Sequence, residues 1–599
     1  PYTLKKRDRI IAKVNSRYLK KTHKFGIKVP KTVPEALVED TKNGNHYWAE
    51  AIAKEMKDVK VAFKILKDDE NVPVDYQFMN CHMIFDLKME DFRRKARLVA
   101  GGHMTDPPAA ATYASVVSRE SVRIALTIAA LNDLDILSAD IQNAYLNAPI
   151  TERIWTTCGA EFGQENMGKK ALIVRALYGL KSAGAAFRNH LALCMIDLGY
   201  QSCLADPDVW MRAKVRDDGF EFYEYVLIYV DDILAISDDP RGCLDRIDKF
   251  FPMKPGSIGT PDIYLGAKIS KVKLPNGVDA WAMSPSKYIQ EAVSNAKAWF
   301  KEHLPDQRWP TKVSSPFSTK YRPELDTTPE LEDEAASYFQ SVIGVLRWTS
   351  ELGRIDITCE LSMLSSFLAM PRQGHLQQVF HIFAYLEKRH NSRMVFDPTY
   401  PVIDETRFKM ECDWKPFYGD VTEAIPENAP KARGKCIVLS LHVDADHAGD
   451  KVTRRSRTGF IISMNKASID WYSKKQNTVE SSSFGSEFVA MKTAMERLRG
   501  LRYKLRMMGI AIDGPTYAFG DNMSVVRNSS APESTLKKKC NSICYHAVRE
   551  AVATGELVVA HEPGVTNPAD ILTKPVPGGQ RREVLVGFLL YDVAHAAGA

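Results

Sequence analysis

Two aspartates stand side by side inside the apolar stretch YVLIYVDDILAIS, residues 225–237. The flanking residues are mostly β-branched or large and apolar, which predicts a buried strand on each side of a short turn. Asp231 and Asp232 do not suit such surroundings, because adjacent carboxylates repel each other and resist desolvation unless a cation holds them. Asp140 ends another predicted strand, DILSAD. If these strands are neighbours in one sheet, three carboxylates meet at one edge, and such hard oxygen ligands suit Mg²⁺ or Mn²⁺.

This first carboxylate set predicts nucleotidyl transfer. Two divalent ions about 3.5–4 Å apart stabilise both the attacking and the leaving oxygen of an in-line phosphoryl displacement. An Asp-Asp pair alone is a weak signal, because turns are rich in aspartate. The pair becomes specific here because predicted strands lie on both sides of it.

A second series of acidic residues lies near the C-terminus, on a predicted strand, helix, strand and helix in turn. Its members are Asp444, Glu487, Asp521 and Asp570. Glu487 opens a predicted helix over 486–509, and Asn567 as N-cap with Pro568 at N1 puts Asp570 in the first turn of another. Taken singly, each acid would more often be a surface residue or a cap. As an ordered set they suit hydrolysis of a phosphodiester by water at a second two-metal site.

Several other elements are predicted to position these residues. Residues 82–102 form two strands joined by a polar turn, and residues 118–135 form an amphipathic helix with Ser118 as N-cap. Asn276-Gly277 marks a hairpin. Residues 280–400 are mostly helical, and a proline-containing loop then leads to a new domain near residue 436.

Composition limits the class of protein. The chain has 599 residues, of which 45% are hydrophobic and 26% charged, so several globular domains are expected. Its ten cysteines include no Cys-x-x-Cys pair and no apolar run reaches about 18 residues, which predicts a reduced, intracellular protein without a membrane span. The net charge is +6, and cations crowd the first thirty positions and residues 451–457, which suits a polyanionic partner.

The hairpin motif YVDD resembles that of the reverse transcriptases, whose palm carries a Tyr-x-Asp-Asp hairpin. Further motifs follow in the order seen in copia-type LTR retrotransposon Pol polyproteins: RKARLVAGG, YASVVSRESVRI, LSADIQNAYLNAPITERIW, ALYGLKSAGAAF, YLGAKIS and SPSKYI. The resemblance extends from about residue 46 to residue 580, and its acidic strand, helix, strand and helix are similar to those of RNase H. The chain opens at Pro1 and has neither an Asp-Thr/Ser-Gly protease motif nor a His/Cys integrase head, so we expect a part of a longer polyprotein.

The resemblance implies roles for individual residues. Asp140, Asp231 and Asp232 would form the metal-binding triad, and Tyr145 would crowd a 2′-hydroxyl and so favour deoxynucleotides. Lys95 and Arg97 would hold the triphosphate. Asp444, Glu487, Asp521 and Asp570 would form the RNase H set, with two Mg²⁺ per active site and Mn²⁺ as an alternative. His561 either assists product release or is a bystander.

The sequence departs from the family pattern at three positions. Ser182 and Gly184 replace Gln and Pro in LYGLKSAGAAF, which puts the contacts of that loop with template and nucleotide in doubt. His447 replaces a Trp after Asp444. SSFGSEF retains only the second of two glutamates, Glu487, which we take as catalytic.

The resemblance also implies an α/β and α+β multidomain chain, a right-hand polymerase followed by an RNase H-like domain. The expected parts are a basic linker or arm (1–45), fingers and palm (46–270), thumb/connection and linker (271–435), an RNase H-like domain (436–580) and a C-terminal tail (581–599). Its expected function is to copy retrotransposon RNA into DNA and to degrade the RNA of the hybrid. A basic face on the helix after Glu487, with Lys474 and Lys475, is expected to follow the hybrid backbone; its cations are Arg497, Arg499, Arg502, Lys504 and Arg506.

Expected partners are an RNA template, a DNA or RNA primer, dNTPs, the RNA–DNA hybrid and the upstream Gag, protease and integrase parts, with no membrane. The expected location is a cytoplasmic virus-like particle, with later delivery of the DNA to the nucleus.

Two rival interpretations remain at this point. A decayed or domesticated copy would bind nucleic acid without catalysis, although all seven carboxylates stand intact in the sequence. A transposase or integrase with an RNase H-like core would explain the second acidic set but leaves YVDD and Asp140 unexplained.

Overall fold

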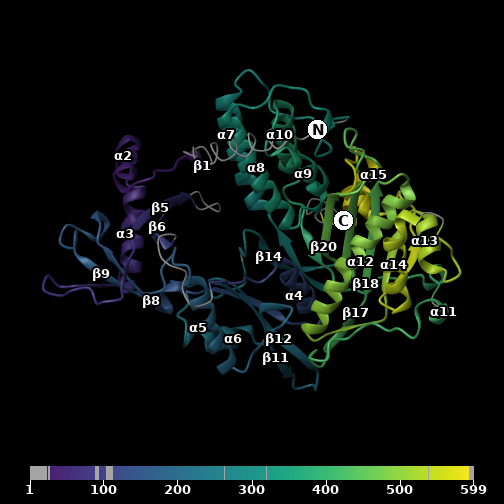
Figure 1. The fold of residues 1–599 in the computed structure, drawn as a ribbon, viewed down its shortest axis with the longest axis horizontal. Coiled ribbons are helices and arrows are strands. Elements are labelled where there is room, and N and C mark those ends of the chain that lie inside the picture. The colour runs from purple at the N-terminus through teal and green to yellow at the C-terminus, as the bar shows by residue number, and fades with distance from the viewer. Residues whose placement is uncertain are drawn as a thin grey trace.

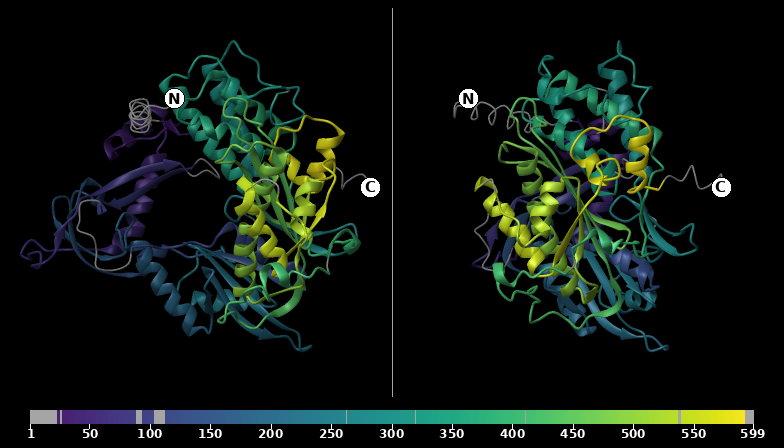
Figure 2. Two further views of the ribbon diagram at one scale, coloured as in Figure 1. Left: turned by 45° about the vertical axis from the view of Figure 1, so that its right-hand side comes forward. Right: turned by 90° about the vertical axis from the view of Figure 1, so that its right-hand side faces the viewer.

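The computed structural model describes residues 23–24, 27–87, 93–102, 112–261, 263–318, 320–409, 411–536 and 539–591. Most of the N-terminal cations therefore lie outside the described residues. Figure 1 shows helices α2 and α3 with strands β5 and β6 on the left, the strands β11 and β12 at the bottom, helices α7 to α10 at the top, and the C-terminal domain on the right. In both turned views the helices drawn in teal stay above the blue strands (Figure 2).

The N-terminal part combines two helices with two small sheets. Helix α3 packs on strand β6, whose hairpin partner is β5, as the alternating apolar residues of both strands predict. A four-stranded sheet follows in the order β3-β9-β8-β4. The bounds are α2 Val33–Asn43, α3 Tyr47–Val59, β3 Phe63–Ile65, β4 Gln77–Phe78, β5 Cys81–Leu87, β6 Arg94–Ala100, β8 Pro149–Thr157 and β9 Lys170–Arg175.

The central sheet carries the Asp-Asp hairpin. Its order is β10-β11-β12-β13-β7, and all neighbouring strands are antiparallel. Helix α4 begins after Ser118, whose hydroxyl accepts from the Ser121 amide, so the predicted N-cap is confirmed. The bounds are α4 Arg119–Leu131, β7 Asp135–Asp140, α5 Ala183–Asp197, β10 Gln201–Cys203, β11 Asp206–Val215, β12 Glu221–Tyr229, β13 Asp232–Ser237 and α6 Pro240–Asp248.

A three-stranded sheet and a group of helices follow. The predicted hairpin at Asn276-Gly277 joins β14 to β15, and Gly277 has a φ of 82°, the left-handed conformation that this turn requires. Strand β16 completes the sheet after the helices. The bounds are β14 Lys268–Lys273, β15 Asp279–Ser284, α7 Ser286–His303, α8 Asp333–Glu351, α9 Thr358–Leu364, α10 Gln373–Lys388 and β16 Met394–Phe396.

The C-terminal domain is a five-stranded mixed sheet in the order β20-β19-β18-β22-β23. The first three strands are antiparallel, and β18, β22 and β23 are parallel. The apolar residues along one side of helix α12 are buried, and the helix packs on β18 and β19. The bounds are β17 Arg433–Ile437, β18 Leu439–Asp446, β19 Arg457–Met464, β20 Ala467–Lys475, α12 Ser483–Met507, β21 Ile510–Ile512, β22 Thr516–Gly520, α13 Met523–Ser530, α14 Ser542–Ala553 and β23 Leu557–His561.

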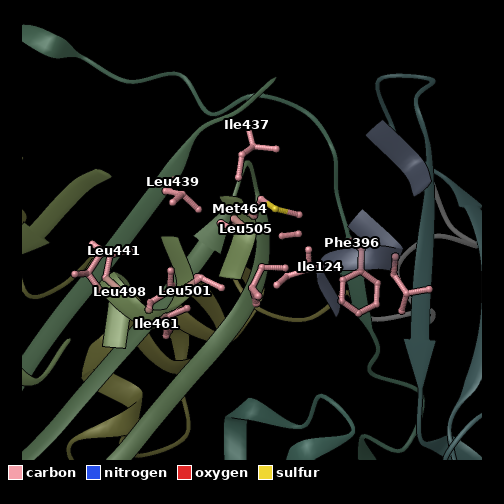
Figure 3. Packing of buried hydrophobic residues seen from close by; sticks show 14 of the residues in the cluster. Ile124, Phe396, Ile437, Leu439, Leu441, Ile461, Met464, Leu498, Leu501 and Leu505 are labelled. Atoms are coloured by element: carbon pink, nitrogen blue, oxygen red, sulfur yellow. The ribbon is translucent and has the colours of Figure 1, made fainter. Parts of the chain in front are cut away.

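One apolar core runs through the central and C-terminal sheets. Ile124 of α4 and Phe396 of β16 belong to the same buried cluster as Leu439, Ile461 and Leu501 of the C-terminal domain (Figure 3). Helix α4 is buried on nearly all sides, which the amphipathic pattern did not predict. The two sheets are therefore parts of one packed body.

A buried cation stabilises the contact between the central and C-terminal sheets. The Arg123 guanidinium of α4 donates to the backbone oxygens of Ile469 (3.0 Å) and Glu351 (2.7 Å) and lies 3.8 Å from the centre of the Trp471 ring. A buried charge of this kind is stable only because each of these groups meets it. Helix α4 thus connects the C-terminal sheet to the helices α7 to α10.

The predicted basic face of α12 was wrong. Its cations form ion pairs inside the protein instead of facing a hybrid: Arg497 with Asp470, Arg499 with Glu556, Arg502 and Arg506 with Glu423, and Lys504 with Glu120. Lys475 likewise pairs with Asp450. The acidic partners are distant in the sequence, so the helix alone could not reveal them.

The regions expected to be an arm, a linker and a tail contain packed structure. Residues 33–43 of the expected arm form helix α2, which begins after the N-cap Thr32 and packs on α3. Residues 397–409 and 411–432 of the expected linker lie against the C-terminal domain. In the expected tail, helix α15 (Gln580–Gly587) buries Arg582, and Tyr591 pairs with Arg393. Among the described residues, no helix has both the length and the apolar composition needed to cross a membrane.

Glu360 of α9 is fully buried, and its nearest ion-pair partner is Arg582 at 3.7 Å. Burial raises the pKa of this carboxyl to about 7, while Arg582 opposes the shift. Because the folded chain binds this proton more tightly than the unfolded chain, the free energy of unfolding should fall by about 3 kcal/mol as pH rises through the window between the ordinary carboxyl pKa and 7.

We therefore expect Glu360→Gln to raise the urea midpoint at pH 8 and to leave it nearly unchanged at pH 5. Urea denaturation at both pH values checks this, with Glu302→Gln, an exposed glutamate on α7, as the control. A variant that is less stable than the native chain at pH 8 would show instead that the pair with Arg582 outweighs the burial.

Candidate functional sites

The strand register brings the first carboxylates together. Asp140, the last residue of β7, lies directly opposite Asp232, the first residue of β13. Asp231 occupies the turn between β12 and β13, and its carbonyl oxygen accepts from the Ile141 amide at 2.8 Å. Val230, the other turn residue, has a φ of 60°, which is strained for a β-branched side chain and is typical of functional turns. All three aspartates therefore lie at one edge of the central sheet.

Lys254 is a member of this site that the sequence did not reveal. Its ammonium forms an ion pair with Asp140 and lies 4.0 Å from a carboxylate oxygen of Asp231. Its backbone amide donates to the Asp140 carbonyl at 2.8 Å, so the two residues are fixed to one another. No charge pattern marks Lys254 in the sequence. Only its position between helix α6 and the motif YLGAKIS could have suggested a role for it.

A cavity of about 800 Å³ opens over this edge. Asp140, Asp231 and Lys254 line one side, and Lys95 and Arg97 of β6 line it as well. The predicted triphosphate cations and two of the predicted metal ligands thus share one cavity. Asp232 lies at the same edge of the sheet but is not among the lining residues.

Tyr145 also lines the cavity. It lies on a single 3₁₀ turn, Ala144–Asn147, which is entered through Asn143 in a left-handed conformation. Its ring centre lies 4.8 Å from that of Tyr178, over which Arg97 lies at 4.4 Å. Burial raises the pKa of Tyr145, and the charge of Asp231 adds to the effect, so its hydroxyl stays protonated at neutral pH. The wall therefore presents a neutral, rigid aromatic surface.

The loop that departs from the family pattern approaches β6 closely. Gly179 has a φ of 91°, and a Cβ there would collide with the Ala100 carbonyl, so this position requires glycine. Ser182 is the N-cap of α5 but makes no capping hydrogen bond, and its buried hydroxyl has no hydrogen-bond partner among the described residues. Gly184 lies against Ala114.

The second acidic set also converges. Carboxylate oxygens of Asp444, Glu487 and Asp521 all lie within 4.8 Å of one another. Asp444 belongs to β18 and Asp521 follows β22, as predicted, whereas Glu487 does not open its helix: α12 begins at Ser483, one turn earlier, with Ser482 as N-cap. Glu487 therefore lies in the second turn, where the helix faces the carboxyl end of the sheet.

These carboxylates are destabilised as anions. Burial raises the pKa of Asp444, and the charges of Asp570 and Asp521 raise it further. Burial raises the pKa of Glu487 well above its usual value, with added repulsion from Asp444 and Asp521. A group of crowded, buried acids of this kind is a site that a divalent cation would stabilise.

Asp570 lies beside this cluster and is held by cations. The 3₁₀ helix Pro568–Leu572 carries it, with Asn567 as the predicted cap, and Asp570 pairs with both Lys574 and Arg581. Burial raises the pKa of Asp444 and of Asp521, and the charge of Lys574 opposes both shifts, so Lys574 lies close to these acids as well. Sequence reasoning missed both cations, although Lys574 follows Asp570 by one helical turn.

His447 and Gly459 also lie at the second acidic set. His447, which replaces the family's Trp, accepts or donates at 3.3 Å with the Ser486 hydroxyl next to Glu487. Gly459 of β19 allows the 3₁₀ helix to lie close, since a Cβ there would be 2.6 Å from Thr573. Neither role could be deduced from the local sequence.

Both acidic sets fit divalent metals. In the first set, three aspartates lie at one sheet edge, and two of them line a cavity together with cations that could hold phosphate. In the second, three carboxylates converge and a fourth lies beside them. Hard oxygen donors in these numbers suit Mg²⁺ or Mn²⁺ and leave coordination positions for water and a phosphate.

The similarity to known proteins agrees with the motifs. Residues 65–296 match the family "Reverse transcriptase (RNA-dependent DNA polymerase)". The Pol polyprotein of transposon RE1 of Arabidopsis thaliana is 25% identical over 84% of this chain and 31% of its own length, and that of transposon TNT 1-94 of Nicotiana tabacum is 25% identical over 92% and 38%. This chain thus spans about a third of the length of these relatives. A crystal structure of LC11-RNase H1 in complex with an RNA/DNA hybrid matches 22% of this chain and 93% of its own, with 18% identity and a TM-score of 0.19.

The order of motifs and the extent of similarity lead to one assignment, and the resemblance stated from the motifs is confirmed. Residues 65–296 match the reverse transcriptase family, and the chain is similar to copia-type retrotransposon Pol polyproteins over most of its length.

Proposed function

We propose that this protein is an RNA-directed DNA polymerase that also degrades the RNA strand of an RNA–DNA hybrid. The observation that carries the proposal is the placement of Asp140 opposite Asp232, beside Asp231, under a cavity that Lys95 and Arg97 also line. A second, separate acidic set supports the hydrolytic activity. A non-catalytic remnant has no observation in its favour, since all seven carboxylates are present.

The proposed layout is that of a right hand. Fingers would comprise α2, α3, the pair β5 and β6 and the sheet β3-β9-β8-β4, and the palm would be the central sheet with α4 to α6. The helices α7 to α10 would form the thumb and connection, and β18 to β23 with α12 to α14 the RNase H domain. The cavity between β6 and the Asp-Asp hairpin would then lie between fingers and palm.

In the first site, Asp140, Asp231 and Asp232 would hold two Mg²⁺. When bound, these ions would neutralise the developing charge of an in-line nucleotidyl transfer. Lys95 and Arg97 would orient the triphosphate through charge-assisted hydrogen bonds. Lys254 would leave Asp140 for phosphate oxygens, and Tyr145 would support the sugar of the incoming nucleotide.

In the second site, Asp444, Glu487, Asp521 and Asp570 would hold the metal ions that serve hydrolysis of RNA. Lys574 and Arg581 fix the Asp570 carboxylate, and Thr573 donates to Asp444, so the acids keep their geometry. Burial raises the pKa of Asp521, and His561 lies close enough that its charge, when it is protonated, would oppose this shift.

The partners follow from this chemistry. An RNA template, a DNA or RNA primer, dNTPs and the hybrid product would bind this chain, and Gag, protease and integrase parts would complete the polyprotein. A virus-like particle in the cytoplasm would be the place of synthesis. The test of the whole proposal is primer extension on an RNA template with Mg²⁺, with the RNA labelled so that cutting is read in parallel.

Tyr145→Val should raise the use of ribonucleotides about 10- to 100-fold relative to deoxynucleotides, because the smaller side chain leaves room for a 2′-hydroxyl. The ratio of kcat/KM for dNTP and rNTP checks this. Tyr178→Phe, which keeps the neighbouring ring, is the control and should leave the ratio unchanged. An unchanged ratio in Tyr145→Val would assign Tyr145 to packing alone.

A further inference from the structure

The segment between β16 and β17 is not a free linker. We call residues 397–409 and 411–432 the strap. It begins where β16 leaves the sheet at the base of the thumb helices and ends at β17, and on the way it crosses the open face of the C-terminal sheet. Neither proposed active site uses its residues.

Apolar contacts anchor the strap to the sheet. Phe408 packs edge-on against Tyr517 (5.2 Å) and Phe519 (5.5 Å) of β22, and Val558 and Ala560 of β23 belong to the same cluster. These residues lie on the face of the sheet opposite α12, because alternate residues of β22 such as Ala518 face the helix core. The strap thus covers the sheet's second face.

Arg407 extends from this anchor to the loop that follows β23. Its guanidinium donates to the Glu562 carboxylate at 2.6 Å and to the His561 carbonyl, and it lies 5.3 Å from the Phe519 ring centre. The other Glu562 oxygen accepts from the Thr566 hydroxyl at 2.6 Å. Burial opposes ionisation of Glu562, but the hydrogen bonds from Arg407 and Thr566 outweigh it and keep its pKa below the usual value. Glu562 therefore connects Arg407 of the strap to the loop, because its carboxylate also accepts from Thr566 at the other end of residues 562–566.

This loop borders the second acidic set. A Cβ on Gly564 would lie 3.2 Å from a carboxylate oxygen of Asp521, and the Gly564 carbonyl accepts from Arg581, which also pairs with Asp570. Asn567 then donates to the Val443 carbonyl at 2.9 Å, next to Asp444. The position of the loop and the positions of three acids are thus linked by direct contacts.

We propose that the strap is a working part of the ribonuclease site, in which Arg407 and Glu562 are positioning residues that hold the loop 562–567 against the acids. This inference rests on the proposed function for its effect on RNA cutting. Residues that orient metal ligands without touching the metal typically change metal affinity or activity about 10- to 100-fold when replaced.

Arg407→Gln in the full chain tests the proposal. Cutting of labelled RNA in a hybrid should fall about 10- to 100-fold in kcat with little change in KM, while primer extension by the same preparation stays unchanged. Arg407→Lys, which keeps the charge and one donor, should recover part of the loss. The matched control is Lys409→Gln, two residues along the strap, whose side chain is exposed and lies 3.9 Å from Glu533.

Hydrogen exchange supplies a readout that needs neither metal nor activity. The amides of Thr566 and Asn567 donate to the Pro563 carbonyl, and that of Glu562 donates to Gly520. Their exchange should speed up in Arg407→Gln and not in Lys409→Gln. If Arg407→Gln also loses extension, Glu562→Gln, which keeps the shape of the side chain, takes its place.

A double-mutant cycle tests the link itself. The double variant Arg407→Gln/Glu562→Gln should cut RNA no more slowly than either single variant, because the two substitutions remove the same interaction. Native exchange rates or native cutting in Arg407→Gln would overturn the proposal. A native chain that never cuts the hybrid would contradict the proposed function, and the exchange rates would still decide whether the strap holds the loop.

Discussion

Asp231→Asn is expected to reduce primer extension on an RNA template by a factor of about 10³ or more, with the cutting of a preformed hybrid left intact. The amide has the shape of the carboxylate but lacks the charge that the cation requires. Asp231 lies in a half-buried turn, and among the described residues only Lys254, at 4.0 Å, loses an ionic partner, so the fold should hardly change. The effect should fall on kcat, because the side chain is proposed to act on the reacting phosphate.

Asp135→Asn is the matched control for this experiment. Asp135 is the first residue of the strand that Asp140 ends, and its side chain is largely exposed beside Lys271. Extension should be native in this variant. Extension within twofold of native in Asp231→Asn would remove the Asp-Asp hairpin from the mechanism, and a joint loss of extension and cutting would show that the two sites are not separate.

Glu487→Gln is expected to have the reverse effect, abolishing RNA cutting and preserving extension. The substitution removes a central member of a set whose oxygens lie within 4.8 Å of one another. It should also raise the thermal midpoint of the metal-free chain at pH 8. Burial raises the pKa of Glu487 well above its usual value. At a pH where this acid must ionise, the free energy of unfolding is therefore lower, and a neutral amide does not cause that loss.

The measurement pairs cutting assays with thermal unfolding at increasing Mg²⁺. The native chain should gain stability with Mg²⁺ at this site, and Glu487→Gln should gain less. Glu496→Gln is the control, since Glu496 lies on the same helix but faces solvent beside Lys492. Full cutting by Glu487→Gln would transfer the catalytic role to another acid and refute this assignment.

Local pattern was sufficient for the elements that carry the acids. The strands around Asp231, the helix after Ser118 and the cap before Pro568 were predicted because each depends on side-chain alternation or on a hydrogen bond within a few residues. Both acidic sets were predicted from the order of their members along these elements.

Contacts between distant segments could not be predicted. Lys254, Lys574 and Arg581 are ordinary surface cations in the sequence, and only the fold brings them to aspartates. The cations of α12 were misassigned because their acidic partners lie as far away as Glu120 and Glu423. Helix α2 was missed because its apolar content is low and its one buried apolar residue, Ala36, gives no period.

The core shared by the central and C-terminal sheets has a consequence for how copies of such a sequence lose function. Ile124 and Arg123 pack into the domain that carries the second acidic set, so damage to this interior should unfold both halves together. Separate loss of one activity then requires substitution at the acids or their immediate supports. A genomic copy whose protein still folds can therefore be judged, one activity at a time, by those few positions.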